Sequence, residues 1–229
     1  MEIVLTKKPQ KPTIIQGFPG FGLIGTITTE FLIEHLNAEL IGEFIYTELP
    51  PTAAIHKGKL IRPMAVYYAE KQNLIILHTI LNVGGFEWLI AENIIGMAKD
   101  LNAKEIICIE GVGINEEVTQ AKIYSYGSEK LKTLGTEALN ESIIMGVTGP
   151  ILLRFENVVG IFAETHSQLP DSMAAAQIIK ILDKYLNLTV DYKPLVEQAK
   201  EFEEKIKGLV QKTNQANEQK KNLEMSYLG

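Results

Sequence analysis

The chain has 229 residues, of which 46% are hydrophobic, and it carries a formal net charge of -6 with a pI near 5.4. This length fits one domain with an appendage, and the hydrophobic content can fill a core. The acidic balance argues against a phosphate-backbone partner, and the only arginines are Arg62 and Arg154, so guanidinium clamps for phosphate are scarce. The composition predicts a globular protein that does not bind nucleic acid.

Runs rich in isoleucine and valine alternate with helix-like segments, which predicts a mostly parallel sheet covered on both faces. Strands are expected at Thr13–Gln16, Leu40–Tyr46, Met64–Ala69, Leu74–Ile80, Glu105–Ile109, Ile123–Ser125 and Val158–Ala163. Helices are expected at Leu23–Leu36, Phe86–Leu101, Glu129–Thr136, Pro150–Phe155 and Ser172–Leu186. A short polar connection over residues 70–73 predicts an antiparallel hairpin, so the sheet is expected to be mixed.

A separate pattern begins at Pro194, where spacings that alternate four and three predict a helix with one apolar stripe. The apolar part of the stripe holds Leu195, Phe202, Ile206 and Leu209. It can pack on the same domain or on a sister chain, and both arrangements stay open. We expect a core domain over residues 1–190, a helix over residues 191–223 and a flexible tail over residues 224–229.

Four glycines fall within nine residues at the first expected strand-to-helix turn, namely Gly17, Gly20, Gly22 and Gly25. The last three fit the dinucleotide-binding pattern G-x-G-x-x-G. However, Pro19 lacks a backbone donor, and the ring of Phe21 crowds the place that a pyrophosphate would need. No cofactor is predicted.

Further glycines follow other expected strands at the edge where open α/β sheets build clefts. They are Gly84, Gly85, Gly111 and Gly113. Together with the first turn, and with Glu110 and Glu164 as acidic groups, they could line one cleft. Alternatively, each glycine only turns the chain sharply between packed layers, and the sequence leaves both interpretations open.

Residues 164–167 place an acid, two hydroxyls and an imidazole in succession, which suggests acid–base or nucleophilic chemistry. Adjacent side chains diverge, however, and the alternative is a helix start capped by Asp171 or Ser172. No catalytic residue is predicted, and an enzyme is the less favoured class. The four histidines have no ligand spacing and Cys108 is the only cysteine, so no metal is predicted and Cys108 is expected to be buried and inert.

The first residues have no signal-peptide pattern, and no apolar run approaches the ~18 residues of a membrane span. A cytoplasmic location is expected. The rigid Pro50-Pro51 segment and the aromatic residues Phe86 and Trp88 could form a docking face, or they could be ordinary core and loop.

Several motifs occur in a fixed order along most of the chain. They are Gly17–Gly25, Pro50-Pro51, Glu110–Gly113, Gly146–Leu153, Ala163–Thr165, Pro170-Asp171 and Ala174–Ala176. This combination resembles the proteasome assembly chaperone 2 family in its archaeal form, from about residue 1 to residue 205. The resemblance implies an α/β/α sandwich like that of the phosphorylase/hydrolase fold, followed by a long C-terminal helix. It also implies self-association into a homo-oligomer and a role in proteasome assembly or in docking on the α ring.

Family members that grip the proteasome end in a hydrophobic residue, a tyrosine and one final residue. Here the chain ends in Met225, Ser226, Tyr227, Leu228 and Gly229, so the tyrosine comes one place early. The resemblance nevertheless gives a candidate partner-binding tail of Met225, Tyr227, Leu228 and Gly229 on a polar stem. The rival hypotheses are a nucleotide or nucleoside site in the glycine-lined cleft, including an ATP-grasp-like ligase, and a bare oligomeric scaffold.

Overall fold

The computed structural model describes residues 1–56, 58–113, 121–165 and 169–191, together with the isolated positions 194, 197, 208 and 211. The strands are β1 Glu2–Leu5, β2 Thr13–Gly17, β3 Glu39–Ile45, β4 Ala54–His56, β5 Lys59–Ile61, β6 Met64–Ala69, β7 Leu74–Thr79, β8 Glu105–Gly113, β9 Ile123–Tyr126, β10 Glu137–Ala138 and β11 Val158–Thr165. The helices are η1 Phe21–Leu23, α1 Ile24–His35, η2 Glu70–Gln72, α2 Glu87–Asp100, α3 Glu129–Thr133, α4 Thr148–Arg154 and α5 Ser172–Leu186.

The described strands form a large mixed sheet in the order β1-β3-β6-β7-β2-β8-β11-β9-β10, and a separate hairpin pairs β4 with β5. The central strands β7, β2, β8 and β11 run parallel to one another. The predicted hairpin of β6 and β7 is confirmed, because the two strands pair antiparallel. The sheet is therefore mixed, as predicted, with a parallel centre that collects strand carboxyl ends at one edge.

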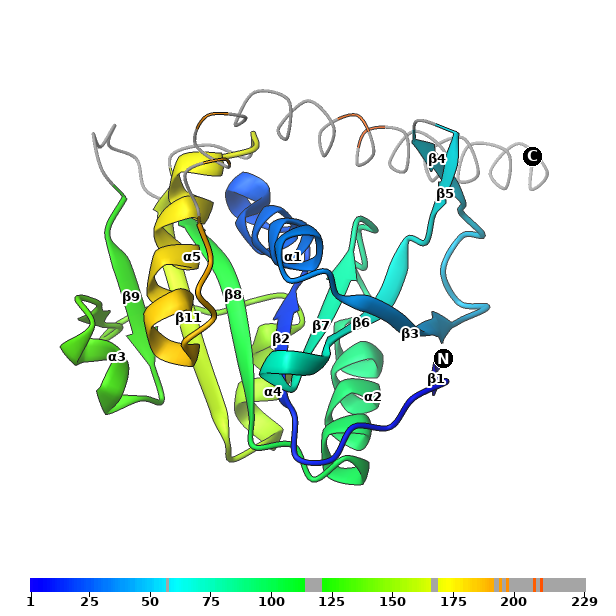
Figure 1. The fold of residues 1–229 in the computed structure, drawn as a ribbon, viewed down its shortest axis with the longest axis horizontal. Helices are drawn as coiled ribbons and strands as arrows, with labels where there is room; N and C mark the ends of the chain where they lie inside the picture. The colour runs from blue at the N-terminus through cyan, green and yellow to red at the C-terminus, as the bar shows by residue number, and fades with distance from the viewer. Residues whose placement is uncertain are drawn as a thin grey trace, which may run out of the picture.

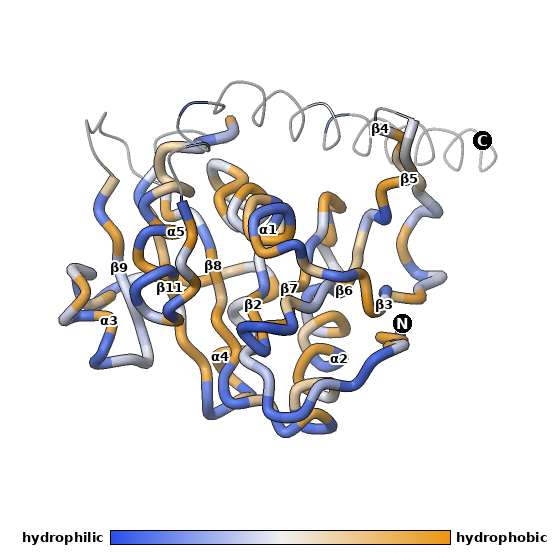
Figure 2. The backbone as a smooth tube through the Cα atoms, in the orientation of Figure 1, coloured by the Kyte–Doolittle hydropathy of each residue, from blue (hydrophilic) through white to orange (hydrophobic). Residues whose placement is uncertain are grey.

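Two helical layers cover the sheet, and these layers confirm the α/β/α arrangement (Figure 1). On one face α1 lies beside α5, and on the other face α2 lies beside α4. Alternation along each strand divides the core between the two faces: Ile15 and Ile107 pack towards α1 and α5, whereas Ile14 and Ile106 pack towards α2 and α4. Figure 2 shows hydrophobic residues along the central strands and on the helices that cover them.

Several predicted boundaries need correction. The pair Gly111 and Gly113 was expected in a turn, but both residues belong to β8 because β11 continues to pair with that strand as far as Gly113. The strands β1, β4, β5 and β10 were not predicted, because they have two to four residues each and so show little periodicity.

Most of the predicted C-terminal helix, including Leu195, Phe202, Ile206 and Leu209, and the whole predicted tail lie outside the described residues. Both stay predictions, as does the division into domains. Within the described part of the chain, no helix has the length and apolar character needed to span a membrane.

Candidate functional site

The carboxyl ends of β2, β7, β8 and β11 meet at one edge of the sheet, where ligands bind in many open α/β folds. Most of the predicted cleft residues lie at this edge. Gly17 ends β2, Glu110 to Gly113 end β8, and Glu164 lies near the end of β11. The sequence therefore predicted the correct edge of the sheet. The contacts of each residue show whether packed atoms or open space lie beside it.

Backbone packing fills most of the first glycine turn. A Cβ atom at Gly17 would lie 2.3 Å from the carbonyl oxygen of Gly25, and one at Gly25 would lie 2.8 Å from the carbonyl oxygen of Ile109. A Cβ atom at Gly111 would lie 2.2 Å from the carbonyl oxygen of Phe21. Such contacts exclude any larger side chain. These glycines allow the turn after β2 to lie directly on β8, and this contact favours the packing interpretation for the three positions.

Among the remaining glycines of the predicted cleft, Gly20, Gly84, Gly85 and Gly113 have more space. Nothing lies within 4 Å of a Cβ atom built on Gly20 or on Gly85, and at Gly113 the nearest atom belongs to the ring of Phe21, at 3.3 Å. Gly22 and Gly85 have φ angles of 63° and 89°, which glycine adopts readily. Gly84 has only the side chain of Asn82 nearby, at 3.3 Å. A Cβ atom at Gly22, in contrast, would lie 3.0 Å from the Thr165 hydroxyl oxygen, so Gly22 belongs to the packed part of the turn.

Glu110 belongs to a polar cluster on the α2/α4 side of the sheet. The Gln16 Nε2 atom donates to the Thr148 hydroxyl over 2.8 Å, and both residues are fully buried. Although Glu110 as a residue is half-buried, its carboxyl lies among these groups, and burial raises its pKa to about 7. Hydrogen bonds with Thr148 oppose this rise. A carboxyl with a pKa near neutrality can exchange a proton under ordinary conditions.

Cys108 lies next to this cluster on β8 and has no exposed surface. Burial raises the pKa of its thiol to about 12, so the thiolate, which is the nucleophilic form, is scarce near neutral pH. The prediction that Cys108 is buried is confirmed, and its inertness stays a prediction.

Glu164 has partners different from those of Glu110. Its carboxylate accepts a hydrogen bond from the Tyr124 hydroxyl over 2.6 Å and one from the Lys122 backbone N–H over 3.1 Å. The first of these bonds is the main cause of the rise in the pKa of Tyr124 to about 12. Both hydrogen bonds of the Glu164 carboxylate come from β9 or from the residue just before it. This side chain therefore joins β11 to the start of β9.

The helix after β11 begins with the expected cap. Asp171 accepts a hydrogen bond from the Ala174 backbone N–H over 2.9 Å and another from the Thr165 hydroxyl over 3.0 Å. His166 and Ser167, the other members of the proposed catalytic group, lie outside the described residues. No group of three or more metal-ligating side chains lies together within the described ranges.

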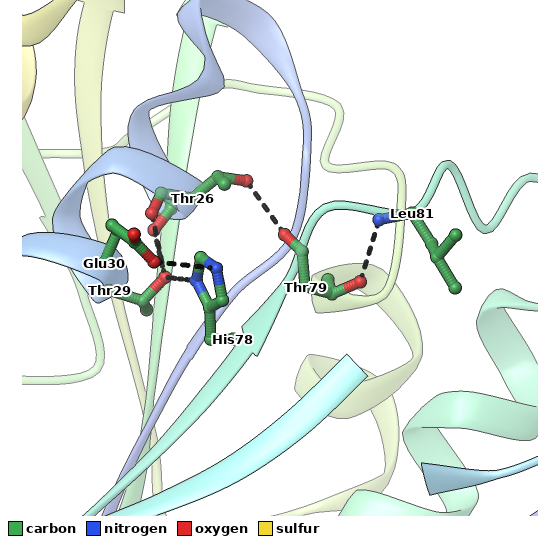
Figure 3. A network of polar contacts seen from close by, with 7 residues as sticks. Thr26, Thr29, Glu30, His78, Thr79 and Leu81 are labelled. Atoms are coloured by element: carbon green, nitrogen blue, oxygen red, sulfur yellow. Dashed lines mark hydrogen bonds and ion pairs between the residues drawn. The ribbon is translucent and has the colours of Figure 1, made fainter. Parts of the chain in front are cut away.

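A second polar network, on the α1 face of β7, was not predicted (Figure 3). The His78 ring lies under α1 with Nδ1 2.9 Å from the Thr29 hydroxyl and Nε2 3.1 Å from a Glu30 carboxylate oxygen. The Thr29 hydroxyl also lies 2.9 Å from the Gly25 carbonyl oxygen and 3.1 Å from that of Thr26, so its one proton can be donated within α1 while its oxygen faces the His78 ring. At the adjacent end of β7, the Thr26 hydroxyl donates to the Thr79 carbonyl over 3.2 Å. The spacing of the histidines in the sequence did not predict this network.

Three of the cavities that the described residues form lie away from the glycine edge. One of ≈ 510 Å³ lies between β1 and α2, one of ≈ 390 Å³ lies between α5 and the start of β9, and one of ≈ 320 Å³ lies between β3 and β5. Pro51 lines the third cavity. Trp88 is half exposed, with the Arg154 guanidinium 4.7 Å from the centre of its ring. The aromatic and proline residues considered as a docking face thus lie in different places.

Comparison with known families decides the classification. The model of the PAC2 family matches residues 14–210. The chain belongs to the PAC2 family. PAC2 relatives of similar length include the uncharacterized protein MJ0106 of Methanocaldococcus jannaschii, which is 28% identical over 209 residues, 88% of this chain and 87% of that protein.

Solved PAC2-like structures share the fold over nearly the whole chain. Pyrococcus furiosus PbaA is described as an archaeal homolog of proteasome-assembly chaperone. Its sequence is 29% identical and its structure matches with a TM-score of 0.82, over 94% of this chain and 98% of the PbaA chain. Pyrococcus furiosus PbaB, described as an archaeal proteasome activator, is 23% identical with a TM-score of 0.74 over 90% of this chain and 97% of its own. The expected family and fold are confirmed.

Proposed function

We propose that this PAC2 protein is a non-enzymatic, self-associating assembly chaperone that binds proteasome α subunits or the α ring. The likeness to PbaA carries the proposal, because it extends over 94% of the chain at 29% identity. The packing of the first glycine turn agrees with it, since Gly17, Gly25 and Gly111 contact backbone where a ligand would otherwise lie.

Self-association has a candidate surface among the described residues. Ile143, Met145 and Leu153 are 89%, 69% and 75% exposed, and all three come from the segment that leads into α4 and from α4 itself. Large apolar side chains gathered in this way often mark an interface between protein chains. This surface is an alternative or an addition to the predicted helix stripe of Leu195 to Leu209.

The tail from Met225 to Gly229 is the proposed contact with the α ring. It is a short segment with three hydrophobic side chains, those of Met225, Tyr227 and Leu228, after a polar stretch, which suits binding in a partner pocket. The proposal keeps this tail despite the early position of the tyrosine.

Co-elution with purified proteasome α subunits from the same source tests the proposal. The full-length chain, a chain stopped after Lys221 and the variant Tyr227→Ala are compared on a sizing column. We expect co-elution only with the full-length chain. Binding by all three proteins would move the contact to the core domain, and binding by none would remove the proteasome from the proposal.

Self-association is tested separately by light scattering of the Leu153→Glu variant. A matched control is Thr133→Glu, which likewise adds one negative charge, at an exposed position of α3. A smaller particle for Leu153→Glu alone would support the α4 surface, whereas unchanged particle sizes would leave the C-terminal helix as the interface.

A small-molecule function retains one supporting observation, the Glu110 carboxyl, whose pKa lies near neutrality. A thermal-shift survey with nucleotides and nucleosides tests it, because a ligand at ~100 times its dissociation constant adds about 2.7 kcal/mol of stability. A shift that Glu110→Gln abolishes would favour this second function over the chaperone role.

A further inference from the structure

The outer edge of the sheet at β1 carries features that neither the family nor the proposed function assigns. β1 is the last strand on its side of the sheet among the described residues, and it pairs only with β3. In Figure 1 it lies near the N-terminus, beside β3 and α2. A strand in this position presents backbone groups that another strand can pair with.

The pairing register identifies the free backbone groups. Val4 lies opposite Glu43, and the Thr6 backbone N–H donates to the Ile41 carbonyl over 2.7 Å. Since residues of an antiparallel pair alternate between bonded and non-bonded positions, Val4 bonds β3 as Thr6 does. The N–H and C=O groups of Ile3 and Leu5 therefore point away from β3, towards the open edge.

A groove runs alongside this edge. The cavity of ≈ 510 Å³ is lined on one side by residues of β1 and on the other by α2, including Asn93, Gly96 and Asp100. The side chains of Ile3 and Leu5 pack on the core below α2, so the edge and the groove belong to one surface. An extended segment added to β1 would place every second side chain over this groove.

Gly96 gives independent support for an occupant. It lies well inside α2, where glycine is a poor helix former, yet its φ angle is not positive and nothing lies within 4 Å of a Cβ atom built there. The packing of the chain itself therefore does not require glycine at this position. The missing side chain instead leaves the floor of the groove open.

The charged residues around the groove indicate which kind of segment can bind there. Glu92, Asp100 and Lys8 line the groove, and Glu2 is also among the lining residues, with its side chain on the face of β1 opposite to Ile3 and Leu5. Glu92 pairs with Arg154 over 2.8 Å, whereas Glu2 and Asp100 take part in no ion pair within the described part of the chain. A segment with lysine or arginine side chains complements this lining.

We propose that the β1 edge and the Gly96 groove bind an extended basic segment of a partner protein, which adds to the sheet as a further strand. The backbone groups of Ile3 and Leu5 bond the segment, and the groove takes its small apolar side chains. The carboxylates of Asp100, beside the groove, and of Glu2, on the other face of β1, attract its basic side chains. This binding is independent of the C-terminal tail.

The probe is a fluorescein-labelled octapeptide that alternates lysine with valine, and its binding to the full-length protein is followed by anisotropy. Three further peptides serve as controls. Two of them are N-methylated at alternate residues, one along each edge of the extended segment. The third has each lysine replaced by glutamate. We expect at least one N-methylated version and the glutamate peptide to bind about tenfold more weakly or worse. Equal binding by all peptides overturns the proposal, as does the absence of saturable binding by the lysine peptide.

The variant Gly96→Trp fills the groove, and Lys99→Trp places the same ring on exposed α2 outside the lining. Thermal melting establishes that both variants are folded. We expect Gly96→Trp to weaken the lysine peptide by about tenfold and Lys99→Trp to change it less than twofold. Equal weakening by both variants overturns the assignment of the groove. A change in particle size on Gly96→Trp, with no effect on the peptide, would instead make a second copy of this chain the occupant and would also overturn the proposal.

Discussion

Replacing Glu110 by glutamine is expected to change how stability depends on pH. Burial raises the pKa of this carboxyl from 4.5 to about 7 in the folded protein. Between these two pH values the folded state binds more protons than the unfolded state, so stability falls as pH rises through the interval. Each pKa unit corresponds to about 1.4 kcal/mol, and the whole rise therefore destabilises the ionised form by about 3 kcal/mol.

Urea denaturation at pH 5, 6, 7 and 8 measures this contribution. Below pH 4.5 the wild type has its full share of stability from the neutral carboxyl, and above about pH 7 that share is lost. Glu110→Gln keeps a similar shape and does not titrate, so the free-energy difference between the two proteins should change by about 3 kcal/mol over the range. Glu156→Gln, at an exposed position, is the control. Parallel pH curves for the wild type and Glu110→Gln would refute the burial argument.

Three further substitutions test contacts described above, all by urea denaturation. Gly111→Ala should destabilise by about 1 to 3 kcal/mol, because its Cβ atom would lie 2.2 Å from a backbone oxygen, whereas Gly20→Ala, with no atom within 4 Å, should change far less. Similar losses for both would contradict the packing interpretation. Asp171→Ala should cost about 1 kcal/mol through loss of the helix cap, and Asp171→Asn should recover most of it. Tyr124→Phe should cost about 1 kcal/mol through loss of the bond to Glu164, and an unchanged midpoint would show that this bond contributes nothing.

Local sequence patterns were sufficient to predict the long helices and strands at the centre of the fold. α5 begins at Ser172 and ends at Leu186 as predicted, because its apolar periodicity and the preceding Asp171 cap both lie within one stretch of chain. The parallel centre followed from strands that alternate with helices. The expected position of the glycine edge followed in turn, since parallel strands bring their carboxyl ends together.

Contacts between distant segments left no local signal. The sequence offered two interpretations of the glycines, and only the 2.2 Å approach of a Gly111 Cβ atom to the Phe21 carbonyl favours one of them. The network of His78 and Thr29 joins two elements that are 49 residues apart. β1 has four residues, too few for alternation to distinguish a strand from an irregular terminus.

The hydrogen bond between Gln16 and Thr148 connects residues that are 132 positions apart in the chain. During synthesis on the ribosome, the Gln16 amide can find this partner only after Thr148 has left the exit tunnel. Closure of such long loops also slows folding of the complete chain. We therefore expect the contact between β2 and α4 to form only late in translation, after β2, β7 and β8 have already left the ribosome.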